Sequence, residues 1–219
     1  MNENSKIMVI GDVHANWPEL NTIINKKHPE IILACGDFGF WPREKQYDIR
    51  RLLTQGSKIY WCDGNHEDFL SLNNRPSNQV HPNVFYMPRG HTMKLPDGRN
   101  VLFFGGADSY DKDSRILGFD WFKEEIPSIE DFDKLSLIKE KVDIVISHTC
   151  PLEFDIISPL EIKINDPTRR ILSHILQVFK PSLWYFGHWH LSKHGKWEDC
   201  RWSALHYVPQ PYCYEWLPM

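Results

Sequence analysis

Five short apolar runs, each followed by an acid, an amide or an imidazole, constrain the fold of this chain most strongly. The runs cover residues 7–10, 31–35, 59–62, 142–147 and 183–186. Short, nearly continuous apolar runs are typical of strands buried on both faces of a sheet. In folds built from such strands, binding sites form at the carboxyl ends. We therefore expect the polar residues that follow the runs to lie close together.

Those polar residues are all oxygen or imidazole donors. Asp12 and His14 lie two residues apart, so their side chains point the same way in extended chain. The other donors are Asp37, Asn65, His148, His188 and His190. A donor set without thiolate suits Mn²⁺, Fe or Zn²⁺ and argues against a closed structural zinc site. The donors are too many for one ion, which indicates two ions about 3.5–4 Å apart, as in hydrolysis of phosphoesters.

The same segments resemble the five signature blocks of the calcineurin-like metallophosphoesterases. The blocks are Gly11-Asp12-Val13-His14, Gly36-Asp37, Gly64-Asn65-His66-Glu67, Ser147-His148 and Gly187-His188-Trp189-His190. They occur in the family's order and extend over nearly the whole chain. The resemblance implies an α/β fold in which two mixed β-sheets pack as a sandwich flanked by helices.

The resemblance also implies which residues bind the metals. The first ion would be bound by Asp12, His14 and His190, and the second by Asn65, His148 and His188. Asp37 would bridge both ions, with a hydroxide bridging them on the opposite side. We expect two divalent ions, with Mn²⁺ favoured and Fe, Zn²⁺, Mg²⁺ or Ni²⁺ as alternatives.

The catalytic residue implied by the resemblance is His66, which follows the ligand Asn65. It would act near the leaving oxygen as a general acid or by stabilising the transition state. We predict that Asn65, His66 and Arg115 contact the substrate, and that Glu67 or Asp63 orients His66 or a metal ligand. For the aromatic residues near the blocks we favour packing over stacking on a base. These are Trp41, Tyr110 and Trp189.

The first two blocks, with Pro18-Glu19-Leu20 and the aromatic residues 38–41 that follow Asp37, resemble the small bacterial, archaeal and phage phosphodiesterase-type members. The Arg-Gly that the protein-phosphatase branch carries after its second block is missing here. We therefore predict a dimetal phosphodiesterase acting on a nucleotide or another small phosphodiester. The alternatives are a phosphomonoesterase acting on nucleotides or phosphoproteins, and a non-catalytic binding scaffold. The intact ligand set and His66 count against the scaffold.

The composition limits the other function classes. The chain has 219 residues, which suits one domain over residues 1–219, and its net charge of -4 gives no strong nucleic-acid-binding signal. No apolar run approaches the ~20 residues of a transmembrane helix. The first strand follows residue 6 directly, which leaves no room for a secretory signal. Five scattered cysteines indicate a reducing cytoplasm. The oligomeric state stays open.

Hydrophobic periodicity predicts the remaining elements. Helices are expected over residues 17–27, 43–55, 67–72 and 168–179, with another that is capped by Ser128 or Ser136 and ends near Lys141. Further strands are expected over residues 84–87, 91–95, 101–104 and 201–208. Residues 73–82 are predicted as a loop, 151–167 as a long polar stretch, 193–196 as a hairpin turn and 209–219 as an extended tail.

Overall fold

The computed structural model describes residues 6–156 and 166–219. Residues 157–165, within the long polar stretch, and residues 1–5, on which the predicted lack of a secretory signal depends, lie outside the described residues.

Two six-stranded mixed sheets form the centre of the molecule. The order in the first sheet is β12 (Tyr214–Trp216), β1 (Ile7–Ile10), β2 (Ile31–Ala34), β3 (Lys58–Trp61), β5 (Val84–Tyr86) and β4 (Gln79–His81). The order in the second sheet is β10 (Lys193–Trp197), β11 (Cys200–Ala204), β9 (Leu183–Phe186), β8 (Ile144–Ser147), β7 (Asn100–Phe104) and β6 (His91–Lys94). The predicted α/β sandwich of two mixed sheets is confirmed.

The alternation of side chains along the strands divides the core into layers. Val9 and Leu33 of the first sheet and Ile146 of the second lie in one apolar cluster between the sheets. Met8 and Ile10, which alternate with Val9, point to the opposite face. Both faces of each central strand are therefore buried, which explains the continuous apolar runs.

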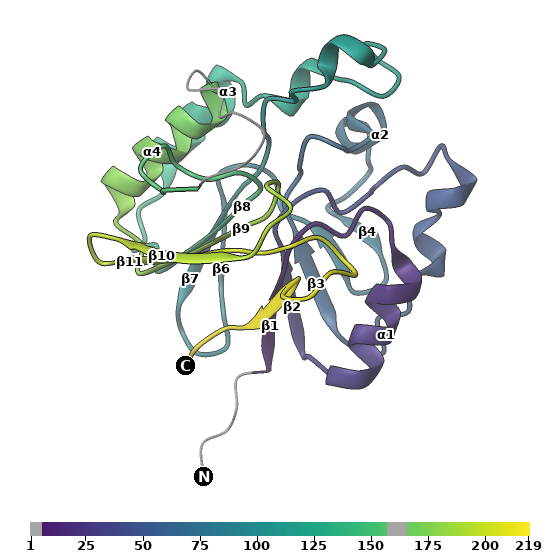
Figure 1. Cartoon of the computed structure of the whole chain (residues 1–219), viewed down its shortest axis with the longest axis horizontal. Coiled ribbons are helices and arrows are strands. Elements are labelled where there is room, and N and C mark those ends of the chain that lie inside the picture. The colour runs from purple at the N-terminus through teal and green to yellow at the C-terminus, as the bar shows by residue number, and fades with distance from the viewer. Residues whose placement is uncertain (1–5, 157–165) are drawn as a thin grey trace.

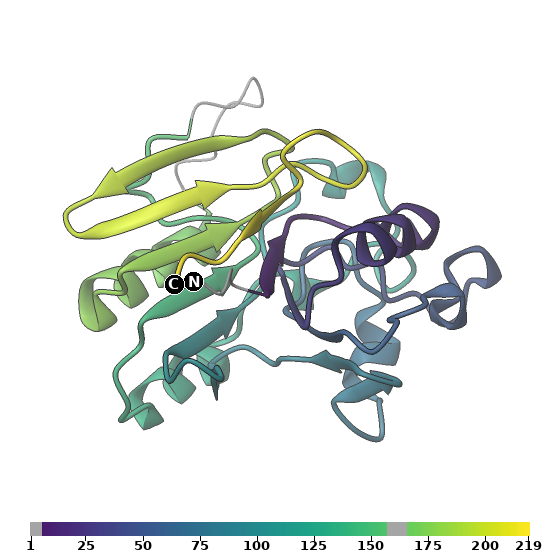
Figure 2. The same cartoon turned by 90° about the horizontal axis from the view of Figure 1, so that it is seen from below.

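Helices cover the outer faces of the sandwich. Helix α1 (Trp17–Lys27) packs against the outside of the first sheet, and α4 (Pro167–Phe179) packs against the outside of the second. Figure 1 shows α1 on one side of the molecule and α3 (Ile129–Asp133) with α4 on the other. Figure 2 shows the hairpin of β10 and β11 extending along the edge of its sheet.

The predicted helix over residues 43–55 is wrong. The segment forms two short 3₁₀ turns, Lys45–Tyr47 and Ile49–Arg51, separated at Asp48. The Asp48 carboxylate accepts a hydrogen bond from the Arg50 amide, a turn-forming contact that competes with helix. The thin apolar stripe of this segment buries too little surface to overcome that contact.

The predicted hairpin turn at residues 193–196 is also wrong, because these residues belong to strand β10. The chain turns just beyond the strand, where Glu198 adopts φ 48°. The last predicted strand is shorter than expected, and the extended tail places β12 antiparallel to β1. Strand β4 lies within residues 73–82, where a loop was predicted.

Other element boundaries move by a few residues. Helix α2 (Phe69–Asn73) begins two residues later than predicted, because Asp68 is its N-cap and accepts a hydrogen bond from the Ser71 amide. Ser128 caps α3, as one of the two alternatives predicted, but α3 ends at Asp133 and continues only as a 3₁₀ turn. Strand β8 begins at Ile144 rather than at residue 142.

Parallel pairing fixes where the site lies. Strands β1, β2 and β3 are parallel neighbours in the first sheet, and β7, β8 and β9 are parallel neighbours in the second. The segments that follow their carboxyl ends meet at one edge of the sandwich, where Asp12 contacts His188 across the two sheets.

Candidate metal centre

The outer group of donors consists of Asp12, His14 and His190. One oxygen of the Asp12 carboxylate lies 3.2 Å from Nε2 of His190 and 4.0 Å from Nε2 of His14. The two imidazole nitrogens lie 3.3 Å apart. The carboxylate is fully buried, whereas the side chains of His14 and His190 are 32% and 47% exposed. These three donors can therefore bind one ion at a position open to solvent.

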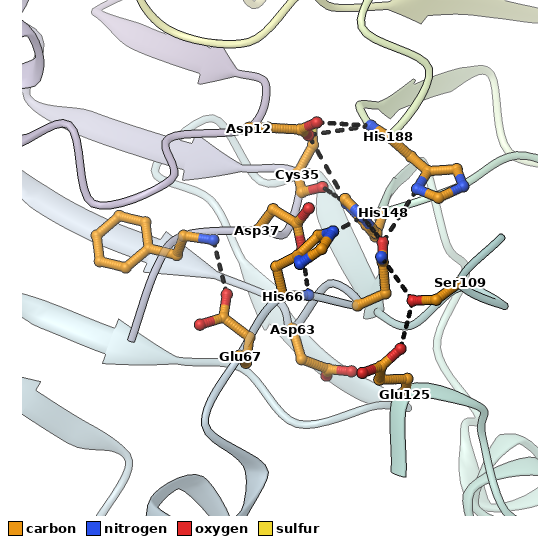
Figure 3. A network of polar contacts seen from close by, with 12 residues as sticks. Asp12, Cys35, Asp37, Asp63, His66, Glu67, Ser109, Glu125, His148 and His188 are labelled. Carbon is orange, nitrogen blue, oxygen red and sulfur yellow. Dashed lines mark hydrogen bonds and ion pairs between the residues drawn. The ribbon is translucent and has the colours of Figure 1, made fainter. Parts of the chain in front are cut away.

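The inner group consists of Asn65, His148 and His188. Oδ1 of Asn65 lies 2.8 Å from Nε2 of His148 and 3.1 Å from Nδ1 of His188. His148 and Asn65 are buried. Figure 3 shows His148 at the centre of the site, with His188 and Asp12 beside it. The inner group thus gathers three donor atoms at a second, deeper position.

Asp37 lies between the two groups. One of its carboxylate oxygens is 3.9 Å from Nε2 of His14, and the other is 3.5 Å from Nε2 of His148. The second oxygen also accepts a hydrogen bond from the His66 amide at 2.8 Å. A single buried carboxylate therefore faces an imidazole of each group, as a bridging ligand must.

Two glycines of the sequence blocks make this convergence possible. A Cβ atom on Gly187 would lie 1.8 Å from Oδ1 of Asp12, and one on Gly64 would lie 2.0 Å from Oδ1 of Asp37. Any larger residue at either position would displace a carboxylate from the site. Gly64 and Gly187, each of which precedes a candidate ligand, are thus required by close packing against another candidate ligand.

Several candidate ligands have backbone conformations that side chains rarely adopt. The φ angles are 49° for His14, 41° for Asp37, 65° for His188 and 50° for His190. Left-handed backbone costs roughly 1 kcal/mol or more at a residue with a side chain. Such strain clusters at functional sites, where the surrounding structure enforces it.

The donor atoms fit a cation better than they fit one another. Nδ1 of His148 lies 2.9 Å from the Cys35 carbonyl, so a neutral His148 places its proton there. Its Nε2 lone pair then faces the Oδ1 lone pairs of Asn65, two acceptors with no proton between them. The Asn65 amide nitrogen donates to Oγ of Ser109 at 2.9 Å, which fixes this orientation. A cation between these acceptors satisfies both.

In the metal-free protein, protons supply part of this positive charge. Burial opposes the charge on His148, but the carboxylates of Asp37 and Asp12 outweigh it and raise the pKa of His148 to about 10. Burial and the charge on His148 lower the pKa of His188 to about 3. Burial disfavours the ionised Asp37, yet His148 and His66 hold the pKa of that carboxyl well below its usual range.

A polar network behind Asn65 was not predicted from the sequence. The Ser109 hydroxyl accepts a hydrogen bond from the Asn65 amide and donates one to the Glu125 carboxylate. Arg115 donates to Oε1 of Glu125 at 2.8 Å and to the Asn65 carbonyl at 3.2 Å. Figure 3 shows Ser109 and Glu125 in line behind the inner group. The network fixes the amide of a candidate ligand.

Arg115 is engaged in this network, and its side chain is only 8% exposed. Its assignment to substrate binding stays a prediction. Glu125 is 16 residues farther along the chain than Ser109, and no pattern in the sequence indicates its place in the network.

Two further carboxylates beside the third block support the backbone. Glu67 is buried and accepts hydrogen bonds from the amides of residues 38, 39 and 40, directly after Asp37. Asp63 pairs with Arg89 and accepts a hydrogen bond from the Tyr86 hydroxyl. Glu67 therefore fixes the loop that carries Asp37. Among the hydrogen bonds of the described residues, neither carboxylate reaches the His66 ring.

His66 lies beside the outer group. Its ring centroid is 5.9 Å from that of His14, and burial lowers the pKa of its imidazole. Tyr207 also lies beside the outer group, with its ring 4.7 Å from that of His190. No pattern in the sequence marks Tyr207 as a residue of the site.

Comparisons with known proteins show the family and the fold. The family model for calcineurin-like phosphoesterases matches residues 5–192. A search of the curated proteins gives no match. The protein TT1561 of Thermus thermophilus is similar in structure, with a TM-score of 0.61 and 13% identity over 91% of this chain and 88% of that one.

Two further solved structures share the fold. The phosphopantetheinyl hydrolase of Mycobacterium tuberculosis has a TM-score of 0.55 and 11% identity, covering 99% of this chain and 97% of that one. GAP50 of Plasmodium has a TM-score of 0.51 and 12% identity, covering 90% of this chain and 70% of that one. At identities this low, the structural similarity shows a shared fold alone. The family model extends across the candidate donors of both groups. The chain belongs to the calcineurin-like phosphoesterase family, whose members depend on two metal ions.

Proposed function

We propose that the protein is a dimetal phosphodiesterase acting on a nucleotide or another small phosphodiester. The observation that carries this proposal is the position of Asp37, one buried carboxylate facing an imidazole of each donor group. The outer group would hold one ion and the inner group the other. When bound, such a pair lowers the pKa of a shared water and neutralises charge on the phosphoryl oxygens.

The residues around the metals have separate tasks in this proposal. His66 lies next to Asn65, where it can give a proton or a hydrogen bond to the leaving oxygen. The Ser109 hydroxyl holds the Asn65 amide in place, and Glu67 holds the loop that follows Asp37. Each assignment is a proposal about this chain's own side chains.

Charge favours a diester over a monoester. A phosphomonoester carries up to two negative charges, whereas a diester carries one. The guanidinium of Arg115 is paired with Glu125 at 2.8 Å, and that of Arg43 is paired with Asp68 at 2.5 Å. Neither cation is therefore left uncompensated for a second substrate charge. We also propose a reducing cytoplasm as its location, because all five cysteines are free.

Within the part of the chain that the structure describes, no helix has the length and hydrophobicity needed to cross a bilayer.

The test compares an aryl phosphodiester with the matching monoester, each with Mn²⁺, with Mg²⁺ and with a chelator. We expect metal-dependent cleavage in which kcat/KM for the diester exceeds that for the monoester. A preference for the monoester would make the phosphomonoesterase the better assignment. No cleavage of either ester by protein with both ions bound would contradict the proposal and favour a binding scaffold.

A further inference from the structure

A pocket with a volume of about 500 Å³ opens directly beside the candidate metal centre. His14 and His66 are among its lining residues, so it adjoins the position where the phosphate would bind. Its volume lies within the range of pockets that hold small organic ligands. A group attached to the reacting phosphorus can therefore extend into it.

Three aromatic side chains line this pocket, namely Trp41, Tyr47 and Phe119. The indole nitrogen of Trp41 donates to the His66 carbonyl at 3.0 Å, which holds that ring beside the site. Tyr47 and Phe119 are 37% and 57% exposed, so much of their apolar surface is open to a ligand. Aromatic faces of this kind favour planar aromatic groups.

Of the aromatic loop over residues 38–41, only Trp41 contributes its ring to the pocket wall. Phe38 and Phe40 are buried, and their rings pack against Trp61 in the core. Phe38 and Phe40 therefore contribute to the core, and Trp41 contributes to the pocket.

The charges in the pocket disfavour an anion. Among the described residues that line it, the only lysine or arginine is Arg43, whose Nε and Nη2 bind the Asp68 carboxylate at 2.5 and 2.7 Å. The other charged lining residues are Glu44 and Asp120, which are both acidic. Carrying a further phosphate or carboxylate into this pocket would therefore place like charges together.

We propose that this pocket binds one ester group of the substrate, a planar aromatic group without a negative charge of its own. Aryl alcohols and nucleosides have this chemistry. The inference rests on the proposed function, because it places the reacting phosphate at the metal centre. It also predicts that an ester group with a negative charge of its own, in addition to the charge of the reacting phosphate, binds poorly.

Binding to protein loaded with Mn²⁺ tests the inference without any need for turnover. The probes are methylphosphonate, benzylphosphonate and (4-carboxybenzyl)phosphonate, which share a metal-binding head and have P–C bonds that resist hydrolysis. We expect calorimetry to show benzylphosphonate binding at least about 10-fold more tightly than methylphosphonate, as burial of a ring predicts. The carboxylated probe should bind about 10-fold more weakly than benzylphosphonate.

Variants assign these differences to the pocket. The double variant Tyr47→Ala/Phe119→Ala should reduce the advantage of benzylphosphonate to less than about 3-fold, because both removed rings are partly exposed and line the pocket. Tyr110→Ala removes an aromatic ring that is 62% exposed and does not line the pocket, and it should change nothing. Glu44→Lys should bring the affinity for the carboxylated probe close to that for benzylphosphonate.

The outcomes separate this inference from the proposed function. Equal affinity for all three phosphonates would overturn the pocket assignment and leave the metal-dependent diesterase standing. An equal effect of Tyr110→Ala and of the double variant would also overturn it. Absence of binding by every phosphonate to the metal-loaded protein would also overturn the pocket assignment, whereas the diesterase proposal fails only if the aryl phosphodiester is not cleaved.

Discussion

The outer and inner donor groups differ in how firmly the protein holds them. In the inner group, the Asn65 amide is fixed by Ser109, and His148 is fully buried with Nδ1 on the Cys35 carbonyl. In the outer group, His14 and His190 are partly exposed, and their ring nitrogens lie against each other. One position is set by hydrogen bonds before a metal binds, whereas the other stays open on one side.

This difference suggests a division of tasks. A buried, prearranged set of donors loses little conformational entropy on binding an ion, so the inner position should have the higher affinity. The open position lies beside His66 and the aromatic pocket, where a substrate must enter. The five predictions below test this asymmetry, beginning with the largest effect.

Asp37→Ala should empty both the outer and the inner metal position, so that no difference between them remains. Its carboxylate faces His14 with one oxygen and His148 with the other, so its loss removes a ligand from each ion. We expect elemental analysis to show that bound metal falls from two ions to near zero and that turnover falls to background. Asp155→Ala removes a carboxylate that is 83% exposed and should retain both ions. A fully loaded Asp37→Ala protein would refute the bridging role.

His66→Ala should leave both positions loaded and still abolish most of the activity. The residue lies beside the outer group but is not among the proposed ligands. We expect turnover to fall by roughly 10²–10⁴-fold, the usual contribution of a positioned proton donor, with two ions still bound. His91→Ala, which removes an exposed imidazole on strand β6, is the control. Unchanged turnover in His66→Ala would exclude His66 from catalysis.

The two groups should also differ in their effect on stability when no metal is bound. His148→Ala removes the buried imidazole that faces the buried Asp37 carboxylate at 3.5 Å, which costs about 3–5 kcal/mol for a broken buried pair. His190→Ala affects a half-exposed side chain and should cost less than about 1 kcal/mol. Urea denaturation in the presence of a chelator measures both. Equal losses would show that the inner group is no more firmly held than the outer one.

The loss of folding stability in His148→Ala should decrease as the pH rises. The pKa of His148 in the folded protein, about 10, lies above the 6.5 of an unfolded chain, so charging of His148 favours folding. This stabilisation is fully present below pH 6.5 and is lost as the pH rises through 10. The difference between wild type and His148→Ala should therefore shrink between pH 7 and pH 10.

Ser109→Ala should weaken only the inner position. Its hydroxyl joins Asn65 to Glu125, and loss of such a partner typically costs about 10–100-fold in metal affinity. A calorimetric titration with Mn²⁺ should show one of two binding steps weakened and the other unchanged. Ser114→Ala, whose hydroxyl bonds to a backbone carbonyl in the same loop, is the matched control. Equal weakening of both steps would contradict a separate inner position.

Much of this site was predictable because its signals are local. Asp12 and His14 follow a continuous apolar run, and the same pattern recurs before the other donors. Helix α4 was predictable within one residue because its apolar stripe is strong. The segment over residues 43–55 has a thin stripe, and a side-chain contact at Asp48 decided its conformation instead.

Other features depend on contacts that no local pattern records. The contact between Ser109 and Glu125 joins residues 16 positions apart, without a motif that relates them. Positive φ angles at His14 and Asp37 arise where loops from different strands pack against one another. Arg43 would have been a cation available to a substrate had Asp68 not been placed beside it.

The sandwich of two sheets, the family, and the identity and order of the donors could all be inferred from the amino-acid sequence alone. These features depend on strand-length apolar runs and on residue types that directly follow them, so the information is contained in neighbouring residues. Only the folded molecule defines which donors are buried, which donors are open to solvent and which charges line the adjoining pocket. Burial and charge pairing are sums over neighbours in space, and those neighbours come from strands and loops far apart in the chain.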